Sequence, residues 1–446
     1  MTQLITPRTL KGFRDYVPAV MMPREAMMDV ARRTFRSFGY APIDTPMLEY
    51  TEILTGKGGD ETDRQMFAFK TRGGKDVAMR FDLTVPLARF AAQHIGELGT
   101  PFRRYHIAPV FRGENPQAGR YREFVQCDFD LVGPTSAMAD TEIVLVIDQL
   151  FRNLSLDRFT IALNNRAVLT GLLEHLGLVD RATAILRSLD KLTKIGRDKT
   201  AAEMVRVAEI DDTQADAVLR LADLHGSAND VLDALPEVTG GNPTATAGIE
   251  RLTEVYRGAI DAGVPEERLK IDVSLARGLD YYTGMIFETT LDDLPGIGSV
   301  CSGGRYDNLA GLYTKTALPG VGASLGLDRL IAALDELKKL PVAGTPAPVL
   351  VPQFEDVSPG RYLRLAAMLR DRGVGVEVYP ETKKLKAQLK YANDRGHQAA
   401  IIAGPSEWEF GKLQIKDLTR RDTHTIDFDD DIEPVLETLR AIISTR

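Results

Sequence analysis

Residues 102–133 (FRRYHIAPVFRGENPQAGRYREFVQCDFDLVG) constrain the fold more than any other stretch of the chain. Two runs of strand-like composition flank a polar segment that contains Gly113, Asn115, Pro116 and Gly119. Glycine, asparagine and proline clusters of this kind end strands and form turns. The stretch therefore predicts a β-hairpin with a long loop.

The two faces of this hairpin differ in chemistry. Because side chains alternate between the faces of a strand, the parity of the residue numbers separates them. One face of the second arm is apolar and is expected in the core: Val125, Cys127, Phe129 and Leu131. The other face carries hydrogen-bonding groups and one ring: Phe124, Gln126, Asp128 and Asp130, with Arg104, His106 and Arg112 from the first arm. A solvated face is the alternative, but such a face normally carries Lys, Glu and Thr. A cation, a flat ring and an acid together suit a ligand that has a phosphate, a base and a cationic or imidazole group.

The hairpin resembles motif 2 of class II aminoacyl-tRNA synthetases and, within them, of the histidyl-tRNA synthetases. The matching residues are Arg112 with Glu114, the turn 119–122 (GRYR), Phe124 and Gln126. The resemblance implies an enzyme that makes histidyl-adenylate from ATP and L-histidine and transfers the histidyl group to the 3′ end of tRNA-His. Many bacterial members carry a basic residue near position 118 or an Arg-Pro pair at 115–116, whereas this loop reads GENPQAG. Which acceptor nucleotides are read therefore stays open.

Composition is that of a soluble globular protein of two or three domains, with 446 residues, 44% apolar and 26% charged. No apolar run approaches the roughly 18–20 residues of a membrane span. The first twenty residues lack the apolar region of a secretion signal, so a cytoplasmic protein is expected. Two cysteines, at 127 and 301, exclude a disulfide framework, and six histidines without metal-ligand spacing predict no dedicated metal site. The net charge of −8 argues against nonspecific nucleic-acid binding. It leaves a tRNA partner possible, because charges are screened beyond about 8–10 Å.

The N-terminal part predicts a helix over about 23–38, with apolar residues at helical spacing, that ends at Gly39. A strand is expected over 41–46, followed by Leu48. This order resembles motif 1 of class II synthetases, through which they dimerise, and so implies a homodimer. A generic helix–strand entry unit is the alternative.

The segment 80–86 (RFDLTVP) is expected to follow a strand and open a helix. Asp82 and Thr84 share parity, so both can point into one pocket; alternatively, one of them only caps the helix. In the family, the matching segment contacts the α-amino group of histidine, where an acid beside an ammonium is the expected chemistry.

The middle of the chain reads as helix, strand (159–163) and helix over 136–176, followed by a helical segment over about 187–269 that is rich in Leu and Ala. This helical segment resembles the insertion of histidyl-tRNA synthetases, which leans towards the tRNA acceptor arm.

Residues 271–290 return to strand character around RGLDYY (277–282). Two adjacent tyrosines are costly there unless their hydroxyls find partners, so the functional interpretation puts Arg277 on a phosphate and the tyrosines around an imidazole. A tyrosine-rich turn that only packs its rings is the alternative. The stretch resembles a motif particular to histidyl-tRNA synthetases. The segment 303–307 (GGRYD) is expected after a strand through Ser299 and Val300, as the family's glycine-rich pocket wall.

Residues 320–337 predict a glycine-rich strand that runs into an amphipathic helix, which resembles motif 3, with Arg329 facing the ATP tail. The pattern GASLG (322–326) also fits the nucleophile elbow of α/β-hydrolases, with His397 or His424 downstream. That elbow needs preceding βα units, and the chain before it reads as hairpins and long strands. Ser324 is therefore interpreted as structural.

Residues 341–348 (PVAGTPAP) read as a linker, and 349–446 as alternating strands and helices of an α/β domain. Four lysines, at 383, 384, 386 and 390, are predicted on one helix of that domain. In the family this domain binds the anticodon, and a basic helix suits a phosphate backbone; a solvated helix face is the alternative.

Together the motifs imply an α+β fold: a class II antiparallel sheet of six or seven strands flanked by helices, a helical insertion and a C-terminal α/β anticodon-binding domain. The expected domains are 1–186 (catalytic, motifs 1 and 2), 187–269 (insertion), 270–340 (catalytic, motif 3), 341–348 (linker) and 349–446 (anticodon-binding).

The resemblance implies a role for each matching residue. Catalysis falls to Arg112, Arg277 and Arg329. Histidine is bound by Asp82, Thr84, Arg112, Gln126, Asp130, Arg277, Tyr281 and Tyr282. ATP is bound by Arg112, Glu114, Arg120, Phe124, Arg277 and Arg329, and Mg²⁺ arrives on the ATP phosphates. The tRNA is contacted by Gln117, Lys383, Lys384, Lys386 and Lys390.

A second hypothesis is the histidine-binding regulatory subunit of ATP phosphoribosyltransferase, which resembles a synthetase catalytic domain but charges no tRNA. Such subunits generally lack the C-terminal domain and the catalytic arginines. Here residues 349–446 and Arg112, Arg277 and Arg329 are all present, which also argues against a non-catalytic tRNA-binding protein.

Overall fold

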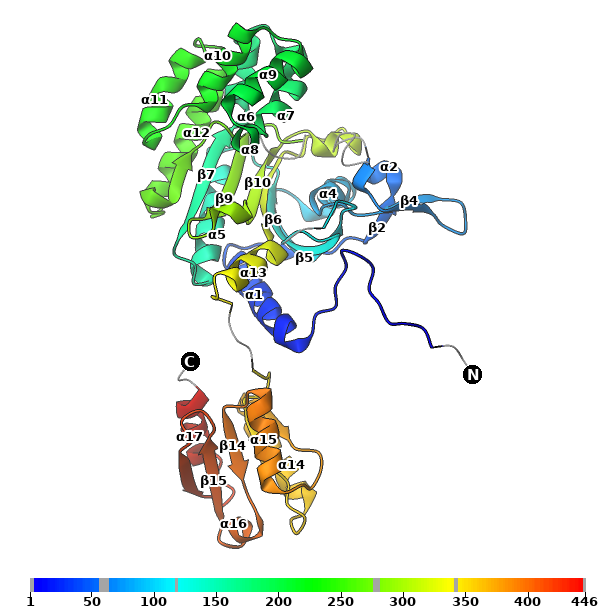
Figure 1. Ribbon diagram of the computed structural model, residues 1–446, viewed down its shortest axis with the longest axis vertical. Coiled ribbons are helices and arrows are strands. Elements are labelled where there is room, and N and C mark those ends of the chain that lie inside the picture. The colour runs from blue at the N-terminus through cyan, green and yellow to red at the C-terminus, as the bar shows by residue number, and fades with distance from the viewer. Residues whose placement is uncertain (1–3, 56–63, 117–118, 276–280, 341–343, 444–446) are drawn as a thin grey trace. The chain divides into compact units, whose positions relative to one another are not determined.

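The structure is a computed structural model that describes residues 4–55, 64–116, 119–275, 281–340 and 344–443 (Figure 1). The chain divides into two compact units: Met1–Asp15 with Arg24–Leu340, and Tyr16–Pro23 with Pro341–Arg446. Each unit is described by itself. Within the described ranges, none of the helices combines the length and the apolar character needed to cross a membrane.

The larger unit is built on a sheet in which the described strands follow the order β1-β5-β6-β11-β10-β9-β7-β8. Their bounds are β1 Ala41–Pro42, β5 Phe102–Phe111, β6 Glu123–Val132, β7 Phe159–Asn165, β8 Leu269–Ile271, β9 Met285–Leu291, β10 Cys301–Tyr306 and β11 Gly320–Gly326. The strands from β5 to β7 in this order pair antiparallel, while β1 and β8 add short parallel pairs at the two edges. The predicted antiparallel sheet flanked by helices is confirmed, and the edge strands make it larger than six or seven strands.

Strands β5 and β6 form the predicted hairpin. Its register sets Arg104 opposite Asp130 and His106 opposite Asp128. Cys127, Phe129 and Leu131 on the other face are almost fully buried. The predicted separation of a polar face from a core face is therefore confirmed.

Helices cover this sheet, and two of the predicted N-terminal bounds were wrong. Helix α1 is Pro18–Ser37 and not 23–38, with Pro23 in its second turn, where the missing N–H forfeits only the bond towards Ala19. The predicted strand 41–46 ends at Pro42. The chain then leaves for a separate three-stranded sheet of β2 (Leu48–Tyr50), β4 (Asp76–Met79) and β3 (Ala68–Lys70). Pro46 has no N–H to donate to a sheet ladder, which favours the break.

The other helices near the site are α2 (Thr51–Leu54), α4 (Thr84–Leu98), α5 (Ala137–Asn153), α6 (Arg166–His175) and α13 (Leu327–Glu336). The helix–strand–helix order predicted for 136–176 is confirmed by α5, β7 and α6. Short 3-10 turns lie at Val179–Arg181, Glu266–Arg268, Pro295–Ile297 and Leu309–Leu312.

Helices continue from α7 to α12: α7 Ala182–Leu189, α8 Leu192–Ile195, α9 Arg197–Ala208, α10 Asp212–Ala222, α11 Ala228–Val238 and α12 Pro243–Asp261. Capping boxes start α10 at Asp211 and α11 at Ser227. Helix α12 packs against α5, α6 and strand β7, and α5 also contacts β11 of the large sheet (Figure 1). The boundaries of the insertion at 187 and 269 stay a prediction.

The smaller unit has the strand order β13-β12-β14-β15-β16. Its elements are β12 Val349–Val351, α14 Pro359–Asp371, β13 Val376–Val378, α15 Leu385–Arg395, β14 Ala399–Ile402, α16 Pro405–Glu409, β15 Lys412–Asp417, β16 Thr423–Asp427 and α17 Glu433–Ile443. The predicted alternation is confirmed, while β16 and α17 had not been predicted. The placement of four lysines on one helix was wrong: Lys383 and Lys384 precede α15, and Lys386 and Lys390 lie on it.

Candidate active site

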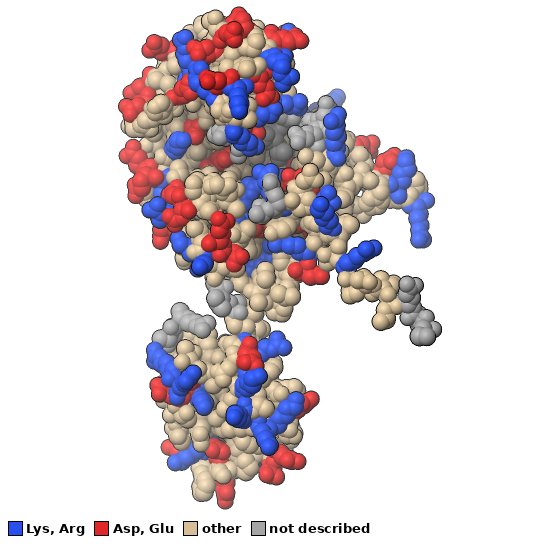
Figure 2. All heavy atoms as spheres, viewed as in Figure 1, with Lys and Arg blue, Asp and Glu red and all other residues tan. Residues whose placement is uncertain are grey.

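A two-lobed cavity opens over the polar face of the β5–β6 hairpin. The two lobes share a wall made of Arg112, Gln126, Ser299, Ser302, Ser324 and Arg329. The "acidic lobe" is further lined by Asp82, Thr84, Asp128, Asp130, Tyr281, Tyr282 and Tyr306. The "arginine lobe" is further lined by Glu114, Arg120, Tyr121 and Phe124. Figure 2 shows lysine and arginine side chains along the hollowed middle of the larger unit.

Asp130 is the most constrained acid of the acidic lobe. Its Oδ1 accepts a hydrogen bond of 2.6 Å from the Tyr306 hydroxyl. Its Oδ2 lies 2.6 Å from Arg104 Nη2, and the Arg104 side chain is fully buried. Burial raises the pKa of Asp130, while Arg104 and Tyr306 oppose this effect. The strands thus hold one carboxylate at the floor of the lobe, in a fixed orientation.

Asp128, two residues earlier, shares this environment. It lies 3.9 Å from Arg104, and burial raises its pKa to about 7, with the nearby Asp130 adding to the shift. His106, opposite Asp128 on β5, is buried, which together with the charges of Arg104 and Arg80 lowers its pKa to about 4. The histidine is therefore neutral near pH 7, and Arg104 is the cation that faces the two acids.

Asp82 fits both interpretations made from the sequence. It lines the acidic lobe, and its Oδ1 also accepts a hydrogen bond of 3.0 Å from the backbone N–H of Val85 at the start of α4. Burial raises the pKa of Asp82, and this helix N–H and the Arg112 charge oppose the shift. This bond to the first turn of α4 holds the acid in place beside the cavity.

Arg112 stands between the lobes, just beyond β5. Its Nε donates to the Phe81 carbonyl at 3.1 Å, and its guanidinium lies 4.4 Å from the Phe81 ring centre and 5.1 Å from that of Phe124. These contacts leave the planar end of Arg112 restrained between two rings. Burial lowers the pKa of Arg112, and Asp82 and Glu114 oppose this shift.

Arg329 is held in the first turn of α13, as predicted. Its Nη1 donates to the Ser299 carbonyl at 2.5 Å. Burial lowers the pKa of Arg329, and the neighbouring Arg120 adds to the effect. Asp328 fixes this turn, because its carboxylate accepts hydrogen bonds from Arg24, Arg14 and the Val125 backbone N–H.

Two glycines let the strands under the acidic lobe approach closely. A Cβ on Gly322 would lie 2.1 Å from Asp130 Oδ1, and one on Gly303 would lie 2.1 Å from the Gly322 carbonyl. The wall segment 303–306 lies within β10, so the expectation that it follows a strand through Ser299 and Val300 was wrong. Glycine is tolerated inside this strand because its neighbours leave no room for a side chain.

The nucleophile elbow is contradicted by the strand pairing. Ser324 lies within β11, which is antiparallel to both β6 and β10, and not on a strand-to-helix turn. Its Oγ accepts a hydrogen bond of 2.8 Å from Gln126 Nε2, so it orients a neighbouring residue of the cavity.

The structure brings most of the predicted site residues to one cavity: Asp82, Thr84, Arg112, Glu114, Arg120, Phe124, Gln126, Asp130, Tyr281, Tyr282 and Arg329. Arg277 and Gln117 lie outside the described residues. Sequence reasoning assigned no specific ligand contact to Arg104, Asp128, Tyr306 or Glu288, although Tyr306 lies in the predicted wall segment 303–307. Parity had placed Arg104 and Asp128 on the polar face, but their pairing depends on the strand register.

Comparison with known proteins agrees with this geometry. Residues 12–330 match the family model described as histidyl-tRNA synthetase. The chain belongs to the histidyl-tRNA synthetase family. Residues 349–438 match the model of an anticodon-binding domain, so the smaller unit is the one expected from the family.

The match to this family extends over the whole chain. A histidine–tRNA ligase of Rhodopirellula baltica is 65% identical over 99% of this chain and 100% of its own length. A histidine–tRNA ligase of Wolinella succinogenes is 43% identical over 93% of this chain and 94% of its own. The crystal structure of histidyl-tRNA synthetase from Nostoc sp. PCC 7120 superposes with a TM-score of 0.89 at 33% identity, covering 98% of this chain and 100% of that one.

Proposed function

We propose that this member of the histidyl-tRNA synthetase family is a histidine–tRNA ligase. It activates L-histidine with ATP and transfers the histidyl group to the 3′ end of tRNA-His. The observation that carries the proposal is the pairing of the two lobes: a fixed buried carboxylate, Asp130, beside a lobe that holds three arginines and the Phe124 ring. The first suits a small ligand with nitrogen donors, and the second suits a nucleotide.

In the acidic lobe, we assign Asp130 and Tyr282 to the two imidazole nitrogens of histidine. Asp82, Thr84 and Gln126 then position the amino-acid backbone, with Tyr281 packed behind at 5.1 Å from the Tyr282 ring. A site that hydrogen-bonds both nitrogens rejects isosteres that lack them by roughly 10⁴, so editing is unnecessary.

In the arginine lobe, Phe124 stacks on the purine and Glu114 steers it, while Arg120 and Arg329 hold the phosphate tail. The histidine carboxylate oxygen forms a bond to the α-phosphorus, and the bond from that phosphorus to the β-phosphate bridging oxygen breaks to release pyrophosphate. We assign to Arg112 and, from the family resemblance, to Arg277 the stabilisation of the charge that develops on the α-phosphate. One preorganised donor of this kind is typically worth roughly 10²–10³ in rate.

Magnesium would arrive on the ATP phosphates. Mg²⁺ keeps several waters and takes few protein ligands, and the Glu288 carboxylate and the Ser302 hydroxyl supply oxygen donors on the cavity wall. The bound ion would neutralise phosphate charge.

We assign tRNA contacts to Gln117 and to Lys383, Lys384, Lys386 and Lys390, and Figure 2 shows basic side chains over the part of the smaller unit that carries α15. Homodimerisation through the motif 1 region, a cytoplasmic location and the domain boundaries given above belong to the same proposal. Sedimentation of the purified chain tests the dimer.

Histidine-dependent ATP–pyrophosphate exchange, run against the other amino acids, tests the proposed function. Exchange with histidine alone supports the ligase. Binding of histidine by calorimetry without exchange would favour the regulatory subunit of ATP phosphoribosyltransferase. The full-length identity to ligases and the presence of Arg112 and Arg329 argue against that alternative.

A further inference from the structure

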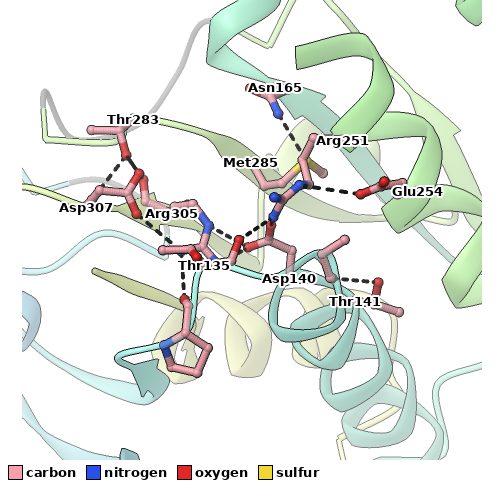
Figure 3. Close-up of polar contacts among 12 residues, drawn as sticks. Thr135, Asp140, Thr141, Asn165, Arg251, Glu254, Thr283, Met285, Arg305 and Asp307 are labelled. Carbon is pink, nitrogen blue, oxygen red and sulfur yellow. Dashed lines mark hydrogen bonds and ion pairs between the residues drawn. The ribbon is translucent and has the colours of Figure 1, made fainter. Parts of the chain in front are cut away.

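Behind the acidic lobe, a buried ion-pair cluster joins strand β10 to helix α5 (Figure 3). Arg305 of β10 is 6% exposed, and its Nε and Nη2 lie 2.8 Å and 2.7 Å from Asp140 Oδ1. Its Nη1 donates to the Pro134 carbonyl at 3.1 Å and to Asp307 at 3.2 Å. The Arg305 side chain is therefore held in one orientation by several partners.

A second arginine completes the cluster from helix α12. Arg251 Nη1 lies 3.0 Å from the other oxygen of Asp140 and 2.8 Å from the Thr135 carbonyl (Figure 3). The two oxygens of the buried Asp140 carboxylate thus each bind a different arginine: Oδ1 binds Arg305 of the sheet, and Oδ2 binds Arg251 of helix α12.

The main chain of Arg305 supports the segment that carries the two adjacent tyrosines. Its carbonyl accepts a hydrogen bond of 2.7 Å from the N–H of Thr283, and the Thr283 hydroxyl donates to Asp307 at 2.6 Å. A Cβ on Gly304 would lie 2.9 Å from the Tyr282 ring, and one on Gly284 would lie 3.1 Å from Arg305 Cδ. Tyr282 and the two residues that follow it therefore pack directly against Gly304 and Arg305 of β10.

The residue that follows Arg305 also reaches the acidic lobe. Tyr306 is the donor to Asp130 Oδ1, so a shift of β10 moves this hydroxyl as well as the support of Tyr282. Arg305 itself does not line the cavity in the described part of the chain. We therefore expect Arg305 to affect a bound ligand through Tyr282 and Tyr306.

We propose that Arg305, clamped by Asp140, is a positioning residue for the amino-acid side of the cavity, and that Arg251 links this clamp to helix α12. The inference rests on the proposed function, because it takes the acidic lobe as the histidine site. A clamp of this kind sets the distance between Tyr282 and Asp130, and misplacement of binding groups by about 1 Å can cost about 10²-fold.

Helix α5 supplies a matched control for a purely structural role. Asp148 on the same helix is also buried, and it pairs with Arg268 at 2.9 Å and Arg152 at 2.8 Å. Among the described residues, neither Asp148 nor these two arginines line the cavity. Asp140→Asn and Asp148→Asn therefore remove equivalent buried charges, but only the first acts on β10.

The experiment measures KM for histidine and for ATP in pyrophosphate exchange, histidine affinity by calorimetry, and thermal unfolding, for the full-length wild type and both variants. Asp140→Asn is expected to raise KM for histidine about tenfold or more and KM for ATP less than about threefold. Asp148→Asn is expected to lower the unfolding temperature while leaving the ratio of the two KM values at the wild-type level. Arg251→Gln, at a side chain 31% exposed, is expected to give a smaller rise of KM for histidine relative to KM for ATP. If Asp140→Asn does not fold, Arg251→Gln provides the test.

Equal changes in both KM values for Asp140→Asn and Arg251→Gln, or the same histidine-specific shift in Asp148→Asn, would overturn the inference. Failure of the proposed function gives a different result, because the wild type itself would then show no histidine-dependent exchange.

Discussion

Removing the Tyr306 hydroxyl tests how the acidic lobe holds its ligand. In the structure this hydroxyl donates to Asp130 Oδ1 at 2.6 Å, and both groups are buried. Tyr306→Phe keeps the ring, which packs 6.0 Å from Tyr281, and removes only the donor. The hydrogen bond lowers the pKa of Asp130 against the effect of burial, so its loss raises that pKa further and frees the carboxylate to rotate.

The size of the effect follows from the charge on the acceptor. Hydrogen bonds to charged groups contribute about 1.5–3 kcal/mol. Because this bond is already present in the free protein, that free energy is the upper limit of the loss in binding, which corresponds to about 10–100-fold in affinity. We therefore expect calorimetry to show histidine binding weakened by up to that factor in Tyr306→Phe, with KM for histidine rising in parallel and KM for ATP little changed.

Tyr313→Phe is the matched control. Tyr313 packs against the same apolar cluster as Tyr306, and its hydroxyl donates to the Ile53 carbonyl at 2.7 Å. Within the described residues it does not line the cavity. Both variants are expected to lose stability, Tyr313→Phe less because its acceptor is a neutral carbonyl, but only Tyr306→Phe is expected to lose histidine affinity. Unchanged affinity in Tyr306→Phe, or an equal loss in the control, would refute the reasoning.

Three further predictions concern residues that the proposed function or the cavity singles out. Arg277→Ala is expected to lower the rate of pyrophosphate exchange by roughly 10²-fold or more with an unchanged unfolding curve; near-normal exchange would remove its assigned role. Gly322→Ala places a Cβ 2.1 Å from Asp130 Oδ1, so calorimetry is expected to show weakened histidine binding. Wild-type affinity in this variant would show that Asp130 can move away from the new methyl group without loss of binding. Burial raises the pKa of Asp128 from 3.8 to about 7, so the folded state binds the proton more tightly, and the free energy of unfolding falls as pH rises through that window. Asp128→Asn is expected to flatten this fall in urea unfolding between about pH 4 and about pH 7, and a slope equal to that of the wild type would contradict the assignment.

Much of the site was predictable because the features that define it are local. Alternation along residues 123–132 separates the core face from the polar face, since successive strand side chains point in opposite directions. A glycine-rich strand running into an apolar-periodic helix likewise locates Arg329 in the first turn of α13, because 3.6-residue periodicity and strand alternation are both properties of a short window.

Contacts between distant segments were decided only by the tertiary structure. The bond between Tyr306 and Asp130 joins residues 176 apart, and that between Arg305 and Asp140 joins residues 165 apart. Alternation determines the face on which a residue lies, but not which strand pairs with it, and β11 and β10 lie between β6 and β9 in the sheet order. The roles of Arg104 and Asp128 depend on that register. The early end of β1 at Pro42 is also a property of the tertiary fold: the Ile43 N–H still donates to the Tyr105 carbonyl of β5, but the chain then joins the separate sheet of β2, β4 and β3.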